Sequence, residues 1–433
     1  MIGATVRVGL IVAVALMSMA CAPPVGTRST PIDGAGASPP TSPTSPTSPT
    51  ISGSPTISGS PATSPSPSET SATAATSAPS SLPGADRGWV TGYYAGYERD
   101  LYPVAEIDWG SLSDLAVAFI LPRPDGSLDQ SLYAGEPEGL ALADELIAAG
   151  HRHDRLVIAS IGGAGMRDTW LSAASAPNRG RFVANLARLV TDEGYDGLDL
   201  DWEPLEEGDG TILRKLIGAL RSALPDALLT MPIDPVNANL PEDLSIYPDL
   251  AVDLDRLNLM SYGMAGAYEG WSSWHSSALM GEGPSTPTSV ASSVRPYLAA
   301  GVPAARLGVG AGFYGLCYAP PVSGPGQELR GATIVADDGV MSYAHIVGTH
   351  ANGTTPLWDD AAFVPYLSFA DATGPEGCGY ISYEDERSLQ AKTAYLASEG
   401  LGGIIIWTIN QGYIADAAPA GRNPLLAALA SQP

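Results

Sequence analysis

The fold is decided by a stretch in which acidic and bulky apolar residues alternate: Asp196-Gly197-Leu198-Asp199-Leu200-Asp201-Trp202-Glu203. Successive side chains of a β-strand point to opposite faces, so Asp199, Asp201 and Glu203 share one face and the apolar residues share the other. If helices cover the apolar face, the three carboxyl groups point into the interior of a barrel. Burying like charges is costly, so we expect some of these groups to be protonated and hydrogen-bonded, with shifted pKa values.

Two alternatives for the same stretch are a solvated acidic strand and a calcium-binding loop. The regular apolar alternation argues against a strand that is exposed on both faces. An EF-hand loop needs glycine at its sixth position, and counting from Asp196 that position is Asp201. We therefore favour a buried strand whose carboxyl groups carry chemistry.

Runs rich in β-forming residues alternate with helical segments from Trp89 onward, an order typical of a parallel α/β fold. The expected strands span residues 90–94, 115–121, 156–161, 197–202, 228–233, 257–262, 307–313 and 404–409. Eight strands in this order predict a closed (β/α)8 TIM barrel, with its chemistry at the carboxyl ends of the strands. A doubly wound open sheet is the alternative, but the glycine-rich phosphate loop of that fold does not match Gly92-Tyr93-Tyr94-Ala95-Gly96.

Amphipathic segments between these strands supply the helices, at residues 140–149, 181–192, 211–224, 289–300 and 388–399. The connection after the seventh strand is much longer than the others and is bounded by Cys317 and Cys378. It contains β-like pieces and an aromatic cluster of its own. We therefore expect a small α+β insertion at about 317–380, between strand seven and its helix.

The first 85 residues have a different composition from the rest. Residues 8–20 are apolar and follow Arg7, which predicts a signal peptide at 1–20. Residues 21–85 are dominated by Ser, Thr, Pro, Gly and Ala and predict a disordered linker, which leaves 86–433 as the catalytic barrel. Ser18-Met19-Ala20-Cys21 resembles the lipobox of bacterial lipoproteins and makes Cys21 a lipidation candidate, with ordinary signal cleavage as the alternative. We expect a protein that is secreted or anchored to the outer face of the cell membrane.

Charge and cysteine usage limit the partners. The two arginines and two acidic residues of the first 85 residues cancel, so the net charge of −25 lies in the folded part. Such a surface repels nucleic acid and anionic headgroups and favours a neutral or cationic substrate. Cys317 and Cys378 are expected to form a disulfide, with two buried thiols as the alternative, and their wide spacing gives no metal-binding signature.

The acidic stretch also carries a family resemblance. Asp196, Asp199, Asp201 and Glu203 fill every acidic position of the DxxDxDxE motif of family 18 glycoside hydrolases, which include chitinases. Other segments of 86–433 are similar to that family's strand ends, namely Gly92-Tyr93-Tyr94, Ser160-Ile161-Gly162-Gly163, Met260-Ser261-Tyr262, Phe313-Tyr314-Gly315, Ile406-Trp407 and the segment Tyr383-Glu384-Asp385. The resemblance implies a (β/α)8 barrel that hydrolyses β-1,4 linkages between N-acetylglucosamine units of chitin or chitooligosaccharides, with no cofactor and no metal.

The resemblance also implies a retaining mechanism in which the substrate's own acetamido oxygen is the nucleophile. Glu203 is then the proton donor, Asp201 hydrogen-bonds the acetamido N–H, and Asp199 shares a proton with Asp201. Tyr262 holds the acetamido group against the anomeric carbon. The residues expected to bind the sugar chain are Tyr93, Ser160, Met260, Trp407, Asp196 and Trp274.

The sequence departs from the family pattern at two positions. Gly263 follows the sixth-strand Tyr262, where the family has Asp, and Asn410 stands where many relatives carry an acidic residue. Both departures bear on fine specificity. The alternative activities are an endo-β-N-acetylglucosaminidase, a cell-wall glycan hydrolase and a non-catalytic chitin-binding lectin, although a retained Glu203 argues against the lectin. The expected partner is an N-acetylglucosamine polymer or oligomer, bound by a monomer.

Overall fold

The computed structural model describes residues 88–237 and 243–430. The predicted signal peptide, the lipidation candidate Cys21 and the linker lie outside these residues. Among the described helices, none combines the length and the apolar character needed to cross a membrane.

Within the described residues, eight parallel strands form a closed barrel in the order β1-β14-β8-β7-β6-β5-β4-β2, and pairing between β1 and β2 closes the ring. These strands are β1 (Trp89–Ala95), β2 (Asp114–Pro122), β4 (Leu156–Gly163), β5 (Gly197–Trp202), β6 (Leu228–Ile233), β7 (Arg256–Leu259), β8 (Leu307–Gly312) and β14 (Gly403–Trp407). A short β3 (Leu128–Asp129) pairs with β2 in the antiparallel sense. The predicted (β/α)8 barrel is confirmed.

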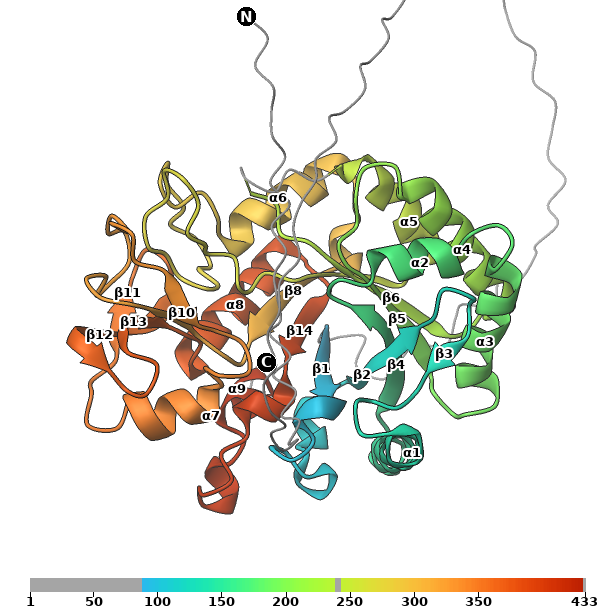
Figure 1. Cartoon of the computed structure of the whole chain (residues 1–433), viewed down its shortest axis with the longest axis horizontal. Helices are drawn as coiled ribbons and strands as arrows, with labels where there is room; N and C mark the ends of the chain where they lie inside the picture. The colour runs from blue at the N-terminus through green and yellow to red at the C-terminus, as the bar shows by residue number, and fades with distance from the viewer. Residues whose placement is uncertain (1–87, 238–242, 431–433) are drawn as a thin grey trace, which may run out of the picture. The chain divides into compact units, whose positions relative to one another are not determined.

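Helices surround the barrel and cover the apolar side of its strands (Figure 1). They are α1 (Glu136–Arg152), α2 (Arg167–Ala173), α3 (Arg179–Thr191), α4 (Gly210–Ala223), α5 (Tyr247–Asp253), α6 (Val290–Ala300), α8 (Glu386–Glu399) and α9 (Pro424–Ala430). The first connection is different, because β1 is followed by three short 3-10 turns in place of an α-helix. Pro103 precedes the second of these turns and lacks the N–H that a continuing helix would need.

Local sequence signals set the ends of the helix that precedes the last strand. At the start of α8, the side chain of Asp385 accepts the backbone N–H of Ser388, and the Ser388 hydroxyl accepts the N–H of Asp385 in return. Gly400 ends the helix with a φ of 66°, in the left-handed region that glycine enters without a steric cost.

The sixth barrel strand is shorter than the expected 257–262, because β7 ends at Leu259. Beyond it, the Ser261 hydroxyl donates to the carbonyl of Gly310 and accepts that residue's N–H, at 3.1 and 2.8 Å. The Ser261 side chain thus takes the place of the backbone hydrogen bonds that would otherwise continue between β7 and β8. The change of direction carries Tyr262 out of the strand and toward the barrel mouth.

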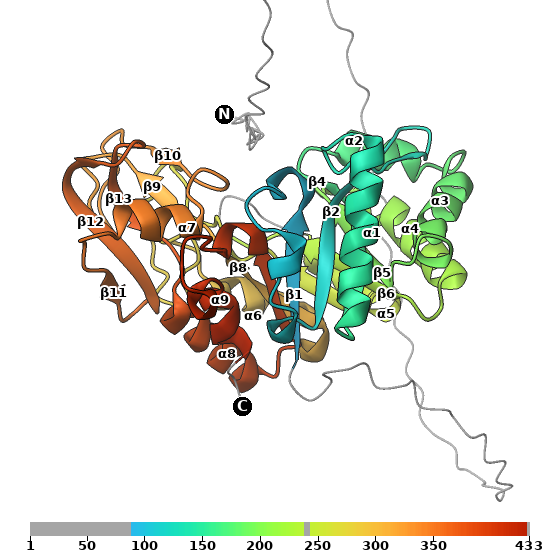
Figure 2. The same ribbon diagram turned by 90° about the horizontal axis from the view of Figure 1, so that it is seen from below.

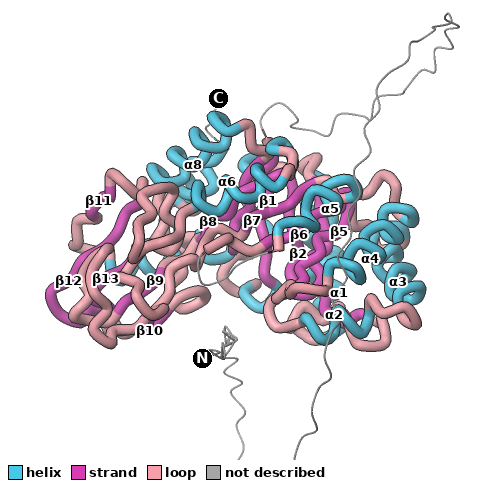
Figure 3. Tube along the Cα trace, turned by 90° about the horizontal axis from the view of Figure 1, so that it is seen from above, coloured by secondary structure: helices cyan, strands magenta, loops and turns pink. Residues whose placement is uncertain are grey.

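The predicted insertion forms a five-stranded antiparallel sheet in the order β10-β9-β13-β12-β11. Its strands are β9 (Leu316–Tyr318), β10 (Ile334–Ala336), β11 (Leu357–Asp359), β12 (Val364–Thr373) and β13 (Cys378–Ser382), with the short helix α7 (Tyr343–His345). Figures 2 and 3 show this sheet beside the barrel, between β8 and α8 along the chain. Cys317 and Cys378 form a disulfide that joins β9 to β13, which decides between the two alternatives left open by the sequence.

A buried ion pair lies at the amino end of the barrel interior. The Arg256 guanidinium, from β7, donates to Asp114 at 2.8 Å and to the Thr91 hydroxyl at 3.1 Å, so it joins three strands. Its side chain also stacks over the ring of Trp89, 4.7 Å from the ring centre. Asp114 is fully buried, and Arg256 is its counter-ion.

We expect Arg256→Met to lower the free energy of unfolding by about 3–5 kcal/mol, because it leaves the Asp114 carboxylate buried without a counter-ion. Urea unfolding of the purified protein measures this change. The control is Arg214→Met, since Arg214 pairs with Asp249 on the surface and an exposed pair contributes about 0–1 kcal/mol. Equal costs for the two substitutions would contradict the proposed role of the buried pair.

Candidate active site

The acidic strand is oriented as its period of two predicts. Leu198, Leu200 and Trp202 of β5 belong to the core between the barrel and its helices, and the Trp202 ring stacks on Trp170 of α2 at 5.1 Å. Asp199 points the other way, into the barrel, where it is fully buried. Packing of the apolar side chains against the helices holds β5 in place. The carboxyl groups of Asp199, Asp201 and Glu203 therefore follow one another along the inner face toward the carboxyl end of the barrel.

Asp199 is held by three hydroxyl groups, two from the adjacent strands β4 and β6 and one from β1, farther round the barrel. Tyr93 and Ser160 donate to one of its oxygens at 2.8 and 2.9 Å, and Thr230 donates to the other at 2.5 Å. Burial raises the pKa of Asp199, while these hydrogen bonds oppose that rise because they stabilise the carboxylate. Ser160, expected to bind substrate, is itself fully buried and acts on Asp199 instead.

Asp201 and Glu203 form a hydrogen-bonded pair at the carboxyl end of β5. Burial, followed by the neighbouring charges of Glu203 and Asp199, raises the pKa of Asp201 well above its usual range. Burial raises the pKa of Glu203 to about 7, and the carboxylate of Asp234 adds to that rise. The pair therefore holds at least one proton at neutral pH. The Oδ1 atom of Asp201 is buried without a protein partner, so it remains available to accept a hydrogen bond.

The backbone of Asp201 is fixed by a close contact with α2. The Trp170 indole donates to the Asp201 carbonyl at 3.1 Å across the end of β4. Gly162 permits this contact, since a Cβ at that position would lie 2.3 Å from the Asp201 oxygen and 2.5 Å from the indole nitrogen. The Ser-x-Gly-Gly segment thus supplies a hydroxyl to Asp199 and space beside Asp201.

A small pocket lies beside Glu203, with Asp234 and Met260 in its wall. Asp234 follows directly after β6 and is half-buried, and burial raises its own pKa to about 6. Met260, which was expected to bind the sugar chain, lies in the wall of the same pocket as Glu203. Asp234 was not predicted, although its position one residue after a barrel strand is a usable signal for this fold.

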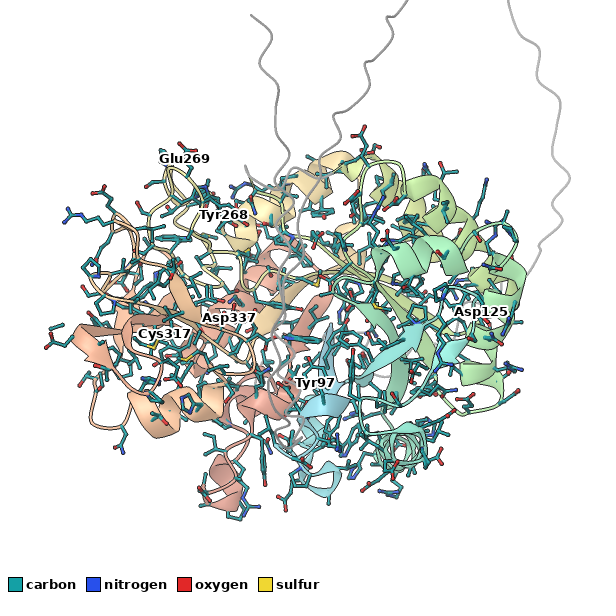
Figure 4. All side chains as sticks on the ribbon, in the orientation of Figure 1. Tyr97, Asp125, Tyr268, Glu269, Cys317 and Asp337 are labelled. Atoms are coloured by element: carbon teal, nitrogen blue, oxygen red, sulfur yellow. A yellow bond between two sulfur atoms is a disulfide. The ribbon has the colours of Figure 1, made fainter. Side chains whose placement is uncertain are left out.

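Aromatic rings line the inner side of the mouth. The Trp407 ring lies 5.7 Å from the ring of Tyr93 and 5.6 Å from that of Phe119, and Trp407 is half-buried. Its indole nitrogen donates to Asp338 of the insertion at 2.7 Å. Figure 4 labels the neighbouring Asp337 at the insertion's edge toward the barrel.

Asp338 connects the insertion with the segments that follow two barrel strands, β14 and β1. Its second oxygen accepts from Gln411 at 2.6 Å, and Gln411 also donates to Glu98 at 2.8 Å. Thr408 donates to the other oxygen of Glu98 at 2.6 Å. Burial raises the pKa of Glu98 to about 7. None of these acidic residues was predicted, because they lie far apart in the sequence and belong to no recognisable motif.

Tyr262 lies at the mouth, with its ring 6.2 Å from that of Tyr314 in an edge-to-face contact. Gly263 follows it with a φ of 60°, and its N–H donates to the Ser276 hydroxyl. A Cβ at Gly263 would lie 2.9 Å from the Tyr314 hydroxyl. The tyrosine hydroxyl therefore occupies the space into which a side chain at this position would extend.

Two further sequence expectations are contradicted. Asp196 lies at the amino end of β5, at the opposite edge of the barrel from Glu203, where it accepts hydrogen bonds from the Val157 N–H and from His151. It binds structural partners and does not reach the mouth. Trp274 is buried in the core of the insertion, and its indole donates to the Thr288 carbonyl at 2.9 Å. Packing of the insertion over the loop after β7 removes this ring from the surface.

Asn410, the other departure from the family pattern, is also structural. Its side-chain oxygen accepts the N–H of Ala95 at 3.0 Å, and its nitrogen donates to the carbonyl of Glu98 at 3.2 Å. These bonds tie the end of β14 to the end of β1. An amide suits this position, because it must both donate and accept.

Comparison with known proteins gives a consistent result. Residues 90–412 match the family described as "Glycosyl hydrolases family 18". The chain is 30% identical over 270 residues to "Chitinase A1" of Niallia circulans, covering 55% of this chain but only 38% of that protein. It is 25% identical over 378 residues to a "chitinase-like effector" of Moniliophthora perniciosa, covering 73% of this chain and 82% of the effector. Its fold resembles the Ostrinia furnacalis group IV chitinase solved with allosamidin, with a TM-score of 0.65 and 22% identity over 79% of this chain and 97% of the other.

The bond between Asp338 and Trp407 predicts a change in the tryptophan spectrum. With Asp338→Ala, the indole N–H of Trp407 loses its charged acceptor, and its resonance in a 15N-tryptophan NMR spectrum is expected to move upfield. Trp407→Phe assigns that resonance. Asp337→Ala is the control, because this neighbouring carboxyl group is not the acceptor. A resonance that stays in place in Asp338→Ala would show that the bond is absent in solution.

Proposed function

The chain belongs to family 18 of the glycosyl hydrolases, and from this premise we propose that it hydrolyses β-1,4 linkages between N-acetylglucosamine units of chitin or chitooligosaccharides. The observation that carries the proposal is the pair formed by Asp201 and Glu203 at the carboxyl end of β5. The two carboxyl groups share a proton there, whereas the deeper Asp199 is hydrogen-bonded to hydroxyl groups. Relatives of the same family and fold are named chitinases, which supports chitin as the substrate.

Glu203 is the general acid in this proposal. A carboxyl group with a pKa of about 7 is partly protonated at neutral pH, so it can give a proton to the leaving glycosidic oxygen. The resulting carboxylate then takes a proton from the incoming water. The same group serves both steps because its pKa lies close to the working pH.

Asp201 and Tyr262 act on the acetamido group of the sugar. In this retaining, substrate-assisted scheme, the acetamido oxygen attacks the anomeric carbon, and the glycosidic bond breaks as Glu203 delivers its proton. The unpartnered Oδ1 of Asp201 is suited to accept the acetamido N–H and to stabilise the positive oxazolinium-like intermediate. Tyr262 would hold the acetamido group in position, which lowers the entropic part of the barrier.

Asp199 takes a supporting part in the scheme. Its three hydroxyl donors stabilise the charged form of Asp199 against the effect of burial, and the charge of that form is one cause of the raised pKa of Asp201. That effect keeps the proton on the Asp201–Glu203 pair. The Trp407 ring, supported by Tyr93 and Phe119, provides an apolar surface on which a sugar ring can stack.

Two other hydrolytic activities use the same acetamido chemistry, an endo-β-N-acetylglucosaminidase and a cell-wall glycan hydrolase. The insertion lies beside the barrel (Figure 1), and its Asp338 contacts Trp407 at the mouth, an arrangement that we take to favour a linear polymer. Comparing product release from chitin oligomers, high-mannose glycans and peptidoglycan separates these candidates. Release from the glycans or from peptidoglycan alone would overturn the proposed substrate.

We also propose that the protein works outside the cell, either released or held at the membrane through a lipid on Cys21. The apolar segment at 8–20 and the residues around Cys21 support export. Mass spectrometry of the mature protein from its natural host tests this, because a diacylated Cys21 and a simple cleavage after residue 20 differ in mass.

We expect Glu203→Gln to lower kcat on an N-acetylglucosamine tetramer by about 10²–10⁴-fold, because the amide cannot donate the proton. The affinity for the tetramer, measured by calorimetry, should remain. Glu207→Gln is the matched control, because Glu207 is exposed and lies outside the acidic strand. A native chain that binds the tetramer without hydrolysing it would favour the lectin alternative.

The pH dependence follows from the same group. Activity is expected to fall as the pH rises through about 7, because Glu203 then loses the proton that it must donate. Asp234→Asn removes a negative charge that contributes to the raised pKa, so the decline should begin at a lower pH. The pH profile of kcat/KM measures both. An unchanged or higher alkaline limit in Asp234→Asn would contradict the role given to Asp234.

A further inference from the structure

Two histidines and a glutamate converge in the insertion, separate from the residues of the barrel mouth. The Nε2 atoms of His345 and His350 lie 2.9 Å from the two oxygens of the Glu376 carboxylate, one histidine on each oxygen. The donor atoms of the three residues lie within 4.8 Å of one another. Three side chains that can each give one lone pair to an ion thus lie together.

The two histidines meet because the helix between them is wound as a π turn. His345 ends α7, and the following π turn (Ile346–His350) has the Ala351 N–H bonded to the Ile346 carbonyl at 2.9 Å. In an α-helix of about 3.6 residues per turn, residues five apart point in different directions. The wider turn brings such residues onto one side, and turns of this kind are frequent at functional sites.

Glu376 comes from the turn between β12 and β13, two residues before Cys378 and its disulfide. Gly374 in the same turn has a φ of 73°, and a Cβ there would lie 2.1 Å from Cε1 of His350. Only a glycine at position 374 leaves room for the His350 ring to pack against the β12–β13 turn. The ring is completely buried and its position is fixed.

We propose that His345, His350 and Glu376 bind one borderline divalent transition-metal ion, with Zn²⁺ as the ion that suits this donor set. Two imidazole nitrogens and one carboxylate oxygen form a ligand set that Zn²⁺ uses with a water in the fourth position. Zn–ligand bonds of about 2.0–2.1 Å separate tetrahedral ligands by about 3.3 Å. Each histidine nitrogen lies 2.9 Å from its own carboxylate oxygen and all the donor atoms lie within 4.8 Å of one another, so the spacing of a zinc site falls inside the range that these atoms already span. Small side-chain movements would admit the ion.

Access and orientation are also compatible with a metal. The His345 side chain is 29% exposed, which leaves a path from solvent and room for the water ligand. The Thr349 hydroxyl lies 3.3 Å from Nδ1 of His345, where it can accept the Nδ1–H of the tautomer whose Nε2 is free to coordinate. The ion would tie the π turn to the β12–β13 hairpin and act as a structural clip.

The alternative is a metal-free hydrogen-bonded triad in which both histidines donate to the carboxylate. The zinc site and the metal-free triad predict different effects of Glu376→Gln. An amide oxygen can still accept one hydrogen bond, so the triad would lose little, whereas a neutral amide is a much poorer ligand for Zn²⁺ than a carboxylate.

The test uses the full, untagged chain, stripped with a chelator and reloaded with ZnSO4. We expect one Zn²⁺ per chain by elemental analysis after desalting, and a rise of several degrees in Tm on adding Zn²⁺. His345→Ala and Glu376→Gln should weaken the affinity about 100-fold or more, measured by competition with a chromogenic chelator. His151→Ala is the matched control, since this surface histidine also contacts a carboxylate but has no second imidazole beside it.

The wild-type chain without stoichiometric Zn²⁺, or both variants with the wild-type affinity, would overturn the proposal. The Tm of the metal-free variants shows whether they fold, which separates loss of a ligand from loss of structure. Cobalt substitution is an independent measurement, because Co²⁺ at a tetrahedral site with nitrogen and oxygen ligands gives visible absorption bands. These bands should appear in the wild type and in His151→Ala, and be missing in Glu376→Gln.

Discussion

The constraint on which this molecule depends is the burial of three carboxyl groups along one face of a single strand. Asp199 accepts hydrogen bonds from hydroxyl groups of three other barrel strands, which stabilise its charged form. Asp201 and Glu203 are left to stabilise each other, and two buried carboxyl groups in contact cannot both be charged without a large cost. A shared proton at the barrel mouth is the physical result.

Much of this arrangement is predictable because it is local. A period of two decides which side chains of β5 face inward, and the apolar partners on the other face need only a covering helix. Helix ends are also set locally, as the capping box of Asp385 and the left-handed Gly400 show for α8. The barrel follows from repetition of the strand–helix unit, so small errors at element ends do not change it.

What the sequence did not reveal are contacts between distant segments. Asp338 and Trp407 are 69 residues apart and meet only because the insertion folds back over the mouth. The same packing hides Trp274, whose position after a barrel strand had suggested a sugar platform. Asp196 was misjudged for a simpler reason: it belongs to the family motif, but it lies before the strand begins, so its side chain is at the wrong edge of the barrel.

The insertion leaves and re-enters the barrel at β9 and β13, which pair side by side and are joined by the disulfide between Cys317 and Cys378. A segment closed at its base in this way can change in length and sequence during evolution without disturbing the strands beneath it. Asp338 sets a limit on that freedom, because whatever replaces the segment must still present an acceptor to Trp407. The insertion can therefore vary in evolution while the carboxyl groups of β5 and the Trp407 ring stay the same.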